Sequence, residues 1–139
     1  MRINYLKAIG AGVVGTLAMT AVGVWVAPMM GMPPMNPAVM LAGKMGGMLS
    51  LGWIGHLMIG TIFALIYASF VASRLSGPPA IRGAIFALAP WLMAQTIVMP
   101  MMGMPIFSGS MMMAGGSLIG HLIFGLVSGG LIGDPALQR

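Results

Sequence analysis

Pro28-Met29-Met30-Gly31-Met32-Pro33 is repeated without change at residues 100–105, and this duplication decides the fold. Each copy lies between two apolar segments. The later segment of each pair carries Ile-Gly-His-Leu, at residues 54–57 in the first half and at residues 119–122 in the second. A six-residue identity of unusual composition, followed in both halves by a second shared motif, indicates an internal repeat. Each unit is expected to contain a helix, a Met-rich loop and a His-bearing helix.

Charged side chains are too rare here for a water-soluble domain. Only 5% of the 139 residues are charged and 59% are apolar, whereas soluble domains carry about 25% charged residues. A helix of about 20 apolar residues crosses the hydrocarbon layer. Helices are required there because lipid cannot form hydrogen bonds with unpaired backbone N–H and C=O groups. The uncharged stretches predict four such helices, at about residues 5–27, 51–73, 80–99 and 117–133.

The expected fold is therefore an all-α integral membrane protein, a four-transmembrane-helix bundle built from two tandem, parallel-oriented two-helix repeats. Each half has two spans, so both halves enter the membrane in the same direction. Short connections favour an up-down-up-down bundle with the second and fourth helices on one diagonal. Gly77-Pro78-Pro79 marks the boundary between repeat 1 (residues 1–76) and repeat 2 (residues 77–139), which together form one structural domain.

The positions of lysine and arginine predict the orientation in the membrane. Lys44 lies between the first two spans, and the other cationic residues fall on the opposite side: Arg2, Lys7, Arg74, Arg82 and Arg139. Cationic segments remain in the cytoplasm, so both termini are expected there and both Met-rich loops outside. The predicted location is the bacterial inner membrane, with the lipid bilayer as partner. The net charge of +5 reflects this topology and does not indicate nucleic-acid binding.

The composition excludes several kinds of chemistry. The chain has no cysteine, so disulfides, thiolate metal sites and cysteine nucleophiles are excluded. Its one acidic residue, Asp134, cannot form a carboxylate pair for acid–base catalysis or for binding a hard metal ion. Nucleotide-binding, zinc-protease and hydrolase motifs are also missing. We therefore expect a protein that is not an enzyme, and we assign no catalytic residue.

His56 and His121 are the two histidines of the chain and occupy equivalent positions, each about five residues inside the outer end of its expected helix. An ionisable residue within a span is a functional-site hypothesis. Small residues lie four positions before and after each histidine, where they leave room for a ligand or allow close helix packing; they are Gly52, Gly60, Ser117 and Gly125. The diagonal of such a bundle, about 13 Å, suits two imidazoles that share a soft metal ion or a haem.

Methionine and glutamine extend this hypothesis. Of the 18 methionines, seven lie in residues 29–48 and seven in residues 99–113. Thioethers bind Cu(I) well and hard ions poorly, so the outer methionines are candidate ligands, namely Met30, Met32, Met102 and Met104. Gln95, the other strongly polar side chain within a span, is expected to fix an imidazole tautomer. Methionine also packs adaptably, so packing alone would explain the loops equally well.

The leading functional hypothesis is a non-enzymatic membrane protein that binds a soft metal, copper, through the His pair and the outer methionines. Two alternatives stay open. One is a bis-His subunit for electron transfer that carries a b-type haem, and the other is a purely structural accessory subunit of a larger membrane complex. The sequence leaves the cofactor undetermined, and it does not distinguish a homo-oligomer from a larger complex.

Three groups of residues together carry a family resemblance: Met29-Met30-Gly31-Met32-Pro33; Leu51-Gly52-Trp53 followed by His56 and Ile59-Gly60; and Gly120-His121-Leu122 with Gly125. With them the chain resembles a family of small four-helix bacterial inner-membrane proteins of unknown function. The resemblance covers nearly the whole chain. It implies the four-helix topology and transfers no activity, ligand or binding residue.

The orientation can be tested by cysteine labelling, because the chain has no cysteine of its own. An impermeant thiol reagent added outside the cell should label Met45→Cys and Ser110→Cys, and it should label Ser76→Cys only after the membrane is opened. Labelling of Ser76→Cys from outside would reverse the orientation and place the Met-rich loops in the cytoplasm.

Overall fold

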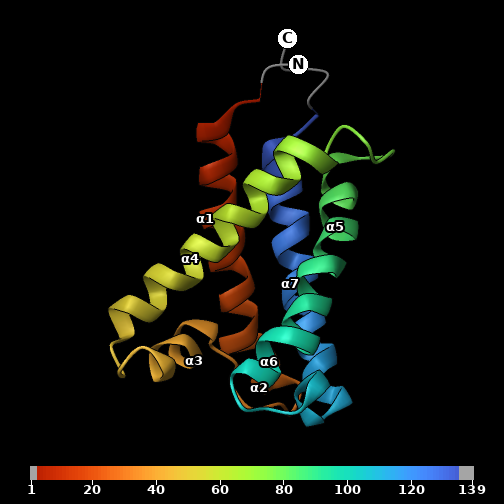
Figure 1. The fold of residues 1–139 in the computed structure, drawn as a ribbon. Coiled ribbons are helices and arrows are strands. Elements are labelled where there is room, and N and C mark those ends of the chain that lie inside the picture. Colours follow the sequence, from red (N-terminus) through yellow and green to blue (C-terminus); the bar gives the residue numbers. More distant parts are fainter. Residues whose placement is uncertain (1–2, 135–139) are drawn as a thin grey trace.

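The protein is helical, and no strand occurs in residues 3–134, the part that its computed structural model describes. Figure 1 shows long helices connected by shorter segments at the two ends of the bundle. The α-helices are α1 (Tyr5–Ala21), α2 (Ala27–Met29), α3 (Pro37–Lys44), α4 (Leu49–Ile66), α5 (Pro79–Met93), α6 (Met99–Met101) and α7 (Met111–Ile132). The π-helical segments are η1 (Val22–Val26), η2 (Tyr67–Val71) and η3 (Ala94–Val98), and η4 (Ile106–Gly109) is a 3₁₀ turn.

Four continuous segments within the described residues are long and apolar enough to cross a membrane: Tyr5–Met29, Leu49–Val71, Pro79–Met101 and Met111–Ile132. They confirm the expectation of an all-α protein with four spans. The first three lie close to their expected positions. Each of these three consists of an α-helix that continues into a π segment, and in the first and third spans a last short α-turn follows.

The fourth span begins earlier than the sequence pattern predicted, at Met111 instead of near Ser117. Ser110 caps this helix, because its side chain accepts a hydrogen bond from the backbone N–H of Met113 at 3.4 Å. The Met-Met-Met-Ala-Gly-Gly stretch is therefore helical. As a consequence, His121 lies well inside α7 and not about five residues from its outer end.

Glycines allow the spans to approach one another closely. A Cβ atom added to Gly12 of α1 would lie 2.7 Å from Thr61 Cα of α4, and one added to Gly129 of α7 would lie 2.8 Å from Gly83 Cα of α5. Small residues are the usual means of close helix packing in lipid. Because α1 also packs against α7, the order around the bundle is α4, α1, α7, α5. This order places α4 and α7 on one diagonal, as the short connections predicted.

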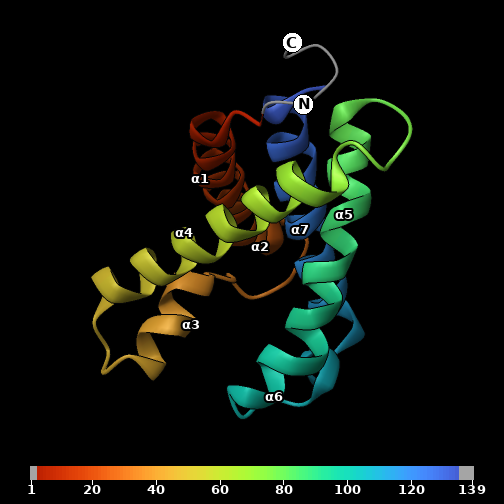
Figure 2. The same ribbon diagram turned by 45° about the horizontal axis from the view of Figure 1, so that its top comes forward.

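On the fourth side of the bundle the helices α4 and α5 diverge towards the Met-rich end. Figures 1 and 2 show α4 running obliquely away from α5, and contact with α5 is made by η2, next to the link that joins them. The helix α3 packs beneath the diverging end of α4, where Gly52 meets the backbone of Ala38. Asn36 caps α3 by accepting from the Ala38 N–H at 3.0 Å.

The two copies of the Met motif fold alike. The backbone N–H of Met30 donates to Ala27 O at 3.0 Å, and that of Met102 donates to Met99 O at the same distance. Each turn ends in a glycine with positive φ, +79° at Gly31 and +80° at Gly103. Side chains rarely adopt this conformation, so glycine is the natural residue at both positions. A π segment precedes both turns, η1 in the first half and η3 in the second.

Three of the four cationic side chains in residues 3–134, those of Lys7, Arg74 and Arg82, lie at the end of the bundle opposite the Met-rich turns. Lys7 Nζ lies 3.6 Å from the position of a Cβ atom on Gly133, at the last turn of α7. The guanidinium of Arg82 donates to Ala72 O at 2.6 Å and lies 3.7 Å from the carboxylate of Asp134. Lys44 lies at the opposite end, after α3. Arg2 and Arg139, which also entered the orientation argument, lie outside the described residues.

Candidate functional site

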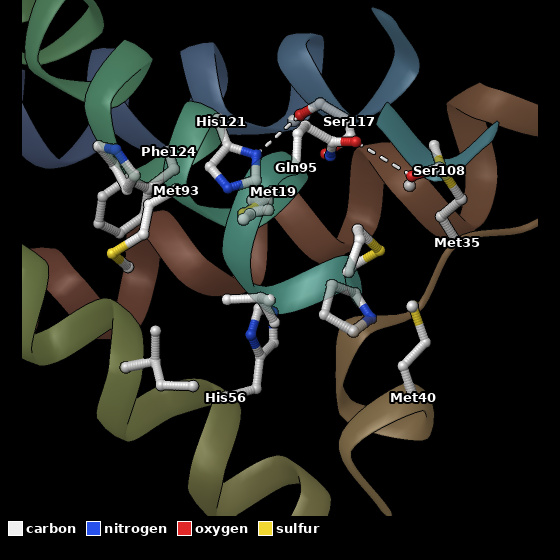
Figure 3. Close-up of a pocket in the computed structure, with 18 of the residues that line it drawn as sticks. Met19, Met35, Met40, His56, Met93, Gln95, Ser108, Ser117, His121 and Phe124 are labelled. Atoms are coloured by element: carbon white, nitrogen blue, oxygen red, sulfur yellow. Dashed lines mark hydrogen bonds between the residues drawn. The ribbon is translucent and has the colours of Figure 1, made fainter. Parts of the chain in front are cut away.

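A cavity of about 200 Å³ opens within the bundle between α1, α4, α5 and α7. Figure 3 shows that His56 of α4 and His121 of α7 approach it from opposite walls. The rest of the lining is mainly apolar and unusually rich in sulfur. Eight methionines contribute to it, among them Met19, Met35, Met40, Met93, Met102 and Met104. The cavity therefore unites the histidines with methionines from both halves of the chain.

His56 is 7% exposed and is fixed by a threonine pair on α1. Its Nε2 atom lies 3.0 Å from Thr20 Oγ1, and the Thr20 hydroxyl donates its single proton to Thr16 O at 2.8 Å. With that proton on Thr16 O the Thr20 oxygen is left to accept, and we infer that His56 Nε2 carries the proton and donates to it. In the neutral ring Nδ1 keeps its lone pair, and no hydrogen-bond partner holds Nδ1 among the described residues.

His121 is fixed by its own helix through the other ring nitrogen. Its Nδ1 atom lies 2.8 Å from Ser117 O, one helical turn earlier. A carbonyl oxygen can only accept, so Nδ1 carries the proton and Nε2 keeps the lone pair in the neutral ring. The described part of the chain supplies no hydrogen bond to Nε2. Each imidazole thus has one nitrogen bonded by the protein and one available to a ligand, but the available atoms differ.

Gln95 is 1% exposed and lines the cavity from η3, yet it does not bond an imidazole. Its Nε2 donates to Ser117 Oγ at 3.2 Å, and its Oε1 accepts from the hydroxyl of Ser108 at 3.0 Å. Figure 3 shows this chain of polar groups beside His121. The sequence predicted that Gln95 would fix the tautomer of an imidazole. At His121 the Ser117 carbonyl fixes the tautomer instead, and Gln95 is connected to His121 only through Ser117.

The predicted methionine ligands separate into two pairs. Met102 and Met104, from the second Met motif, line the cavity. Met30 is 56% exposed and lies outside it, whereas Met32 is 6% exposed and packs against Gly116, with Sδ 2.6 Å from the position of a Cβ there. Equivalent residues of the two motifs therefore have different surroundings, although the two turns have the same backbone geometry.

The small residues that flank the histidines act mostly in helix packing. Gly60 accommodates the Thr16 side chain of α1, and Gly125 meets the backbone of Gly83 on α5. Gly52 packs against α3, away from the cavity. Gly60 also borders the cavity, as does Ser117. Clearance for a ligand is thus a secondary role at two of the four positions.

Sequence reasoning missed Thr20 and Ser108, which bond His56 and Gln95. Thr16 and Thr20 are spaced by one helical turn in the first span, and this spacing was the available signal because it places two hydroxyls on one face. Ser108 gave no signal, since nothing in the second loop predicted that its hydroxyl would point inwards.

Within the described residues no three His, Cys, Asp or Glu side chains form a cluster that could hold a metal ion. A metal site here would consequently need methionine sulfur beside the two imidazoles.

Comparison with known proteins identified one family. The sequence profile of a family described as "Family of unknown function (DUF6789)" matches residues 3–136, which is nearly the whole chain. This match confirms the resemblance seen in the sequence. Neither the curated proteins nor the solved structures include a match to the chain.

The tautomers of the two histidines can be read by NMR of their ring nitrogens in ¹⁵N-histidine-labelled protein without added metal. His56 should be protonated at Nε2 and His121 at Nδ1, because their hydrogen-bond partners are different. Thr20→Val keeps the shape of the side chain and removes the acceptor, so it should abolish the preference at His56 and leave His121 unchanged. The same tautomer at both positions in the unmodified protein would contradict the assignment.

Proposed function

The chain belongs to that family of unknown function, and we propose from its cavity that it is a non-enzymatic membrane protein that binds Cu(I). In this proposal His56 and His121 are the two nitrogen ligands, and sulfur atoms of cavity methionines complete the set. Of the methionines predicted from the sequence, Met102 and Met104 line the cavity and are the candidate ligands. Met30 and Met32 are no part of the proposed site, because neither lines the cavity.

The observation that carries the proposal is the state of the two imidazoles. Histidines that bind metals usually donate the proton of their second ring nitrogen to a protein oxygen, which fixes the tautomer and presents the other nitrogen to the ion. His56 does this with the Thr20 hydroxyl, and His121 does it with Ser117 O. Both imidazoles line a cavity whose other lining residues supply thioethers and no carboxylate. Such a ligand set selects a soft ion.

The same geometry favours copper over haem. Haem iron binds axial histidines through Nε2, because Nδ1 lies next to the Cβ atom and would bring the side chain against the porphyrin. His56 Nε2 is already bonded to Thr20. The cavity of about 200 Å³ is also smaller than the roughly 300–1,000 Å³ of pockets that enclose larger ligands. A single ion needs neither a different tautomer at His56 nor a larger space.

We also propose that the two halves are tandem repeats with parallel orientation in a bacterial inner membrane, with both termini in the cytoplasm. The matching Met turns and the preceding π segments support the repeat. The gathering of Lys7, Arg74 and Arg82 away from the Met-rich end supports the orientation, because cationic segments stay in the cytoplasm. The outer methionines would then meet an ion that arrives from outside.

Binding of Ag(I), a redox-stable substitute for Cu(I), tests the proposal in purified protein. His56→Ala and His121→Ala should each lower the affinity for Ag(I) by more than about 100-fold. Mutating a residue that only hydrogen-bonds a metal ligand already lowers metal affinity by about 10–100-fold. The double variant Met102→Leu/Met104→Leu should also weaken binding, because leucine preserves bulk and cannot ligate. Binding should weaken on acidification, since a protonated imidazole cannot bind the ion.

The matched control is Met30→Leu/Met32→Leu, which changes the equivalent positions of the first motif and should leave the affinity for Ag(I) unaltered. A Soret band in protein from its native membrane, lost in His121→Ala, would favour the haem alternative. Silver binding that is absent, or indifferent to both histidines, would refute the proposal and leave the structural accessory subunit as the explanation.

A further inference from the structure

The two outer loops close the cavity by different means. The first loop contains α3 (Pro37–Lys44), whose residues pack on α4 at Gly52. It is also held to the first span by a backbone hydrogen bond from the Met35 N–H to Gly23 O at 2.9 Å. The second loop has no α-helix of comparable length between α6 and α7 and closes its side with η4, a single turn.

This turn has an unfavourable backbone. Phe107 and Ser108 both have positive φ, +52° and +57°, in the left-handed region. Residues with a Cβ atom seldom adopt this region, and two in succession are rarer still. The turn therefore depends on its side-chain contacts to remain in place. A turn of this kind tends to open when those contacts are lost.

Two side-chain contacts hold the turn against the cavity. The Ser108 hydroxyl donates to Gln95 Oε1, deep in the bundle, at 3.0 Å. The Phe107 ring lies against Trp91 of α5, with a centroid distance of 6.0 Å. Ser108 itself forms part of the cavity wall. The first contact is a single hydrogen bond, and it joins a loop residue directly to the polar chain that ends at His121.

Methionines continue across the turn from the surface to the cavity. Met101 and Met111, on either side of the turn, are 78% and 76% exposed, and Met112 is 57% exposed. The neighbouring residues Met102, Met104 and Met113 line the cavity. The same short segment therefore carries methionine sulfur both at the protein surface and at the cavity wall. The first loop also has exposed methionines, Met29 and Met30, and its Met35 and Met40 line the cavity. There, however, the packed helix α3 and the Met35–Gly23 hydrogen bond hold the loop in place.

We propose that a soft metal ion reaches His56 and His121 from the outer side through the second loop, and that the Ser108–Gln95 hydrogen bond holds this entrance closed. This inference rests on the proposed function, which identifies the ion as Cu(I). The opening of the loop is a separate property that can be measured without any metal.

Reaction of a cysteine inside the cavity measures the opening directly. Met113→Cys, in the otherwise cysteine-free chain, should react slowly with a small water-soluble thiol reagent. Adding Ser108→Ala should raise this rate about tenfold, the effect expected from the loss of one hydrogen bond. Ser108→Gly should raise it less, because glycine removes the hydroxyl but also relieves the left-handed backbone. Met101→Cys, already exposed at the surface, should react at the same rate in all three backgrounds.

The rate of Ag(I) binding tests whether the ion enters the cavity through the second loop. In stopped-flow experiments Ser108→Ala should accelerate binding, whereas Met101→Leu/Met111→Leu/Met112→Leu should slow it without a large change in affinity. The matched control, Met29→Leu/Met30→Leu/Met48→Leu, replaces exposed methionines on the first-loop side and should not slow binding.

The outcomes separate the two proposals. If the protein binds no silver, the proposed function fails, and the thiol reaction still decides whether the second loop opens. Equal reaction rates of Met113→Cys with and without Ser108→Ala would overturn the closed entrance. Equal slowing by the two methionine triple variants would overturn the route through the second loop.

Discussion

Polar groups within the spans have no bulk water to bond, so they take hydrogen-bond partners from the protein where these are within reach. This constraint determines the state of the site. His56 uses the threonine hydroxyls of α1, and His121 uses a carbonyl of its own helix. Each bond uses one ring nitrogen, and both imidazoles line a cavity to which eight methionines contribute. The hydrogen bonds thereby fix which nitrogen of each imidazole is bonded by the protein and which is not.

Close glycine contacts provide the frame for this cavity and also explain its asymmetry. The pairs α1–α4 and α5–α7 are brought together by Gly12 with Gly60 and by Gly83 with Gly125. Gly23 of η1 stands where η3 has Gln95. At Gly23 the loop backbone approaches so closely that no side chain would fit, whereas Gln95 extends inwards to meet Ser108. The first half thus has a closely packed backbone at this position, and the second half has a polar side chain bonded to its loop.

The sequence predicted the spans, the diagonal placement of the His-bearing helices and the shared Met turns, because these follow from hydropathy, chain length and an exact motif. It did not predict where α7 begins, since this glycine-rich span has poorly marked ends in the sequence and the cap at Ser110 sets its start. It could not separate Met102 from Met30, because their local sequences are identical and only tertiary packing distinguishes them. Thr20 and Ser108 were missed for a related reason: each is bonded to a residue far from it in the chain.

X-ray absorption at the copper K edge of Cu(I)-loaded protein tests the central claim most directly, because it reports the atoms bound to the ion. The account predicts nitrogen neighbours with the outer-shell scattering of imidazole, together with sulfur. His56→Ala and His121→Ala should each reduce the imidazole contribution. A shell made only of sulfur, or one of oxygen from water that both variants leave unchanged, would contradict a copper site held by the His pair.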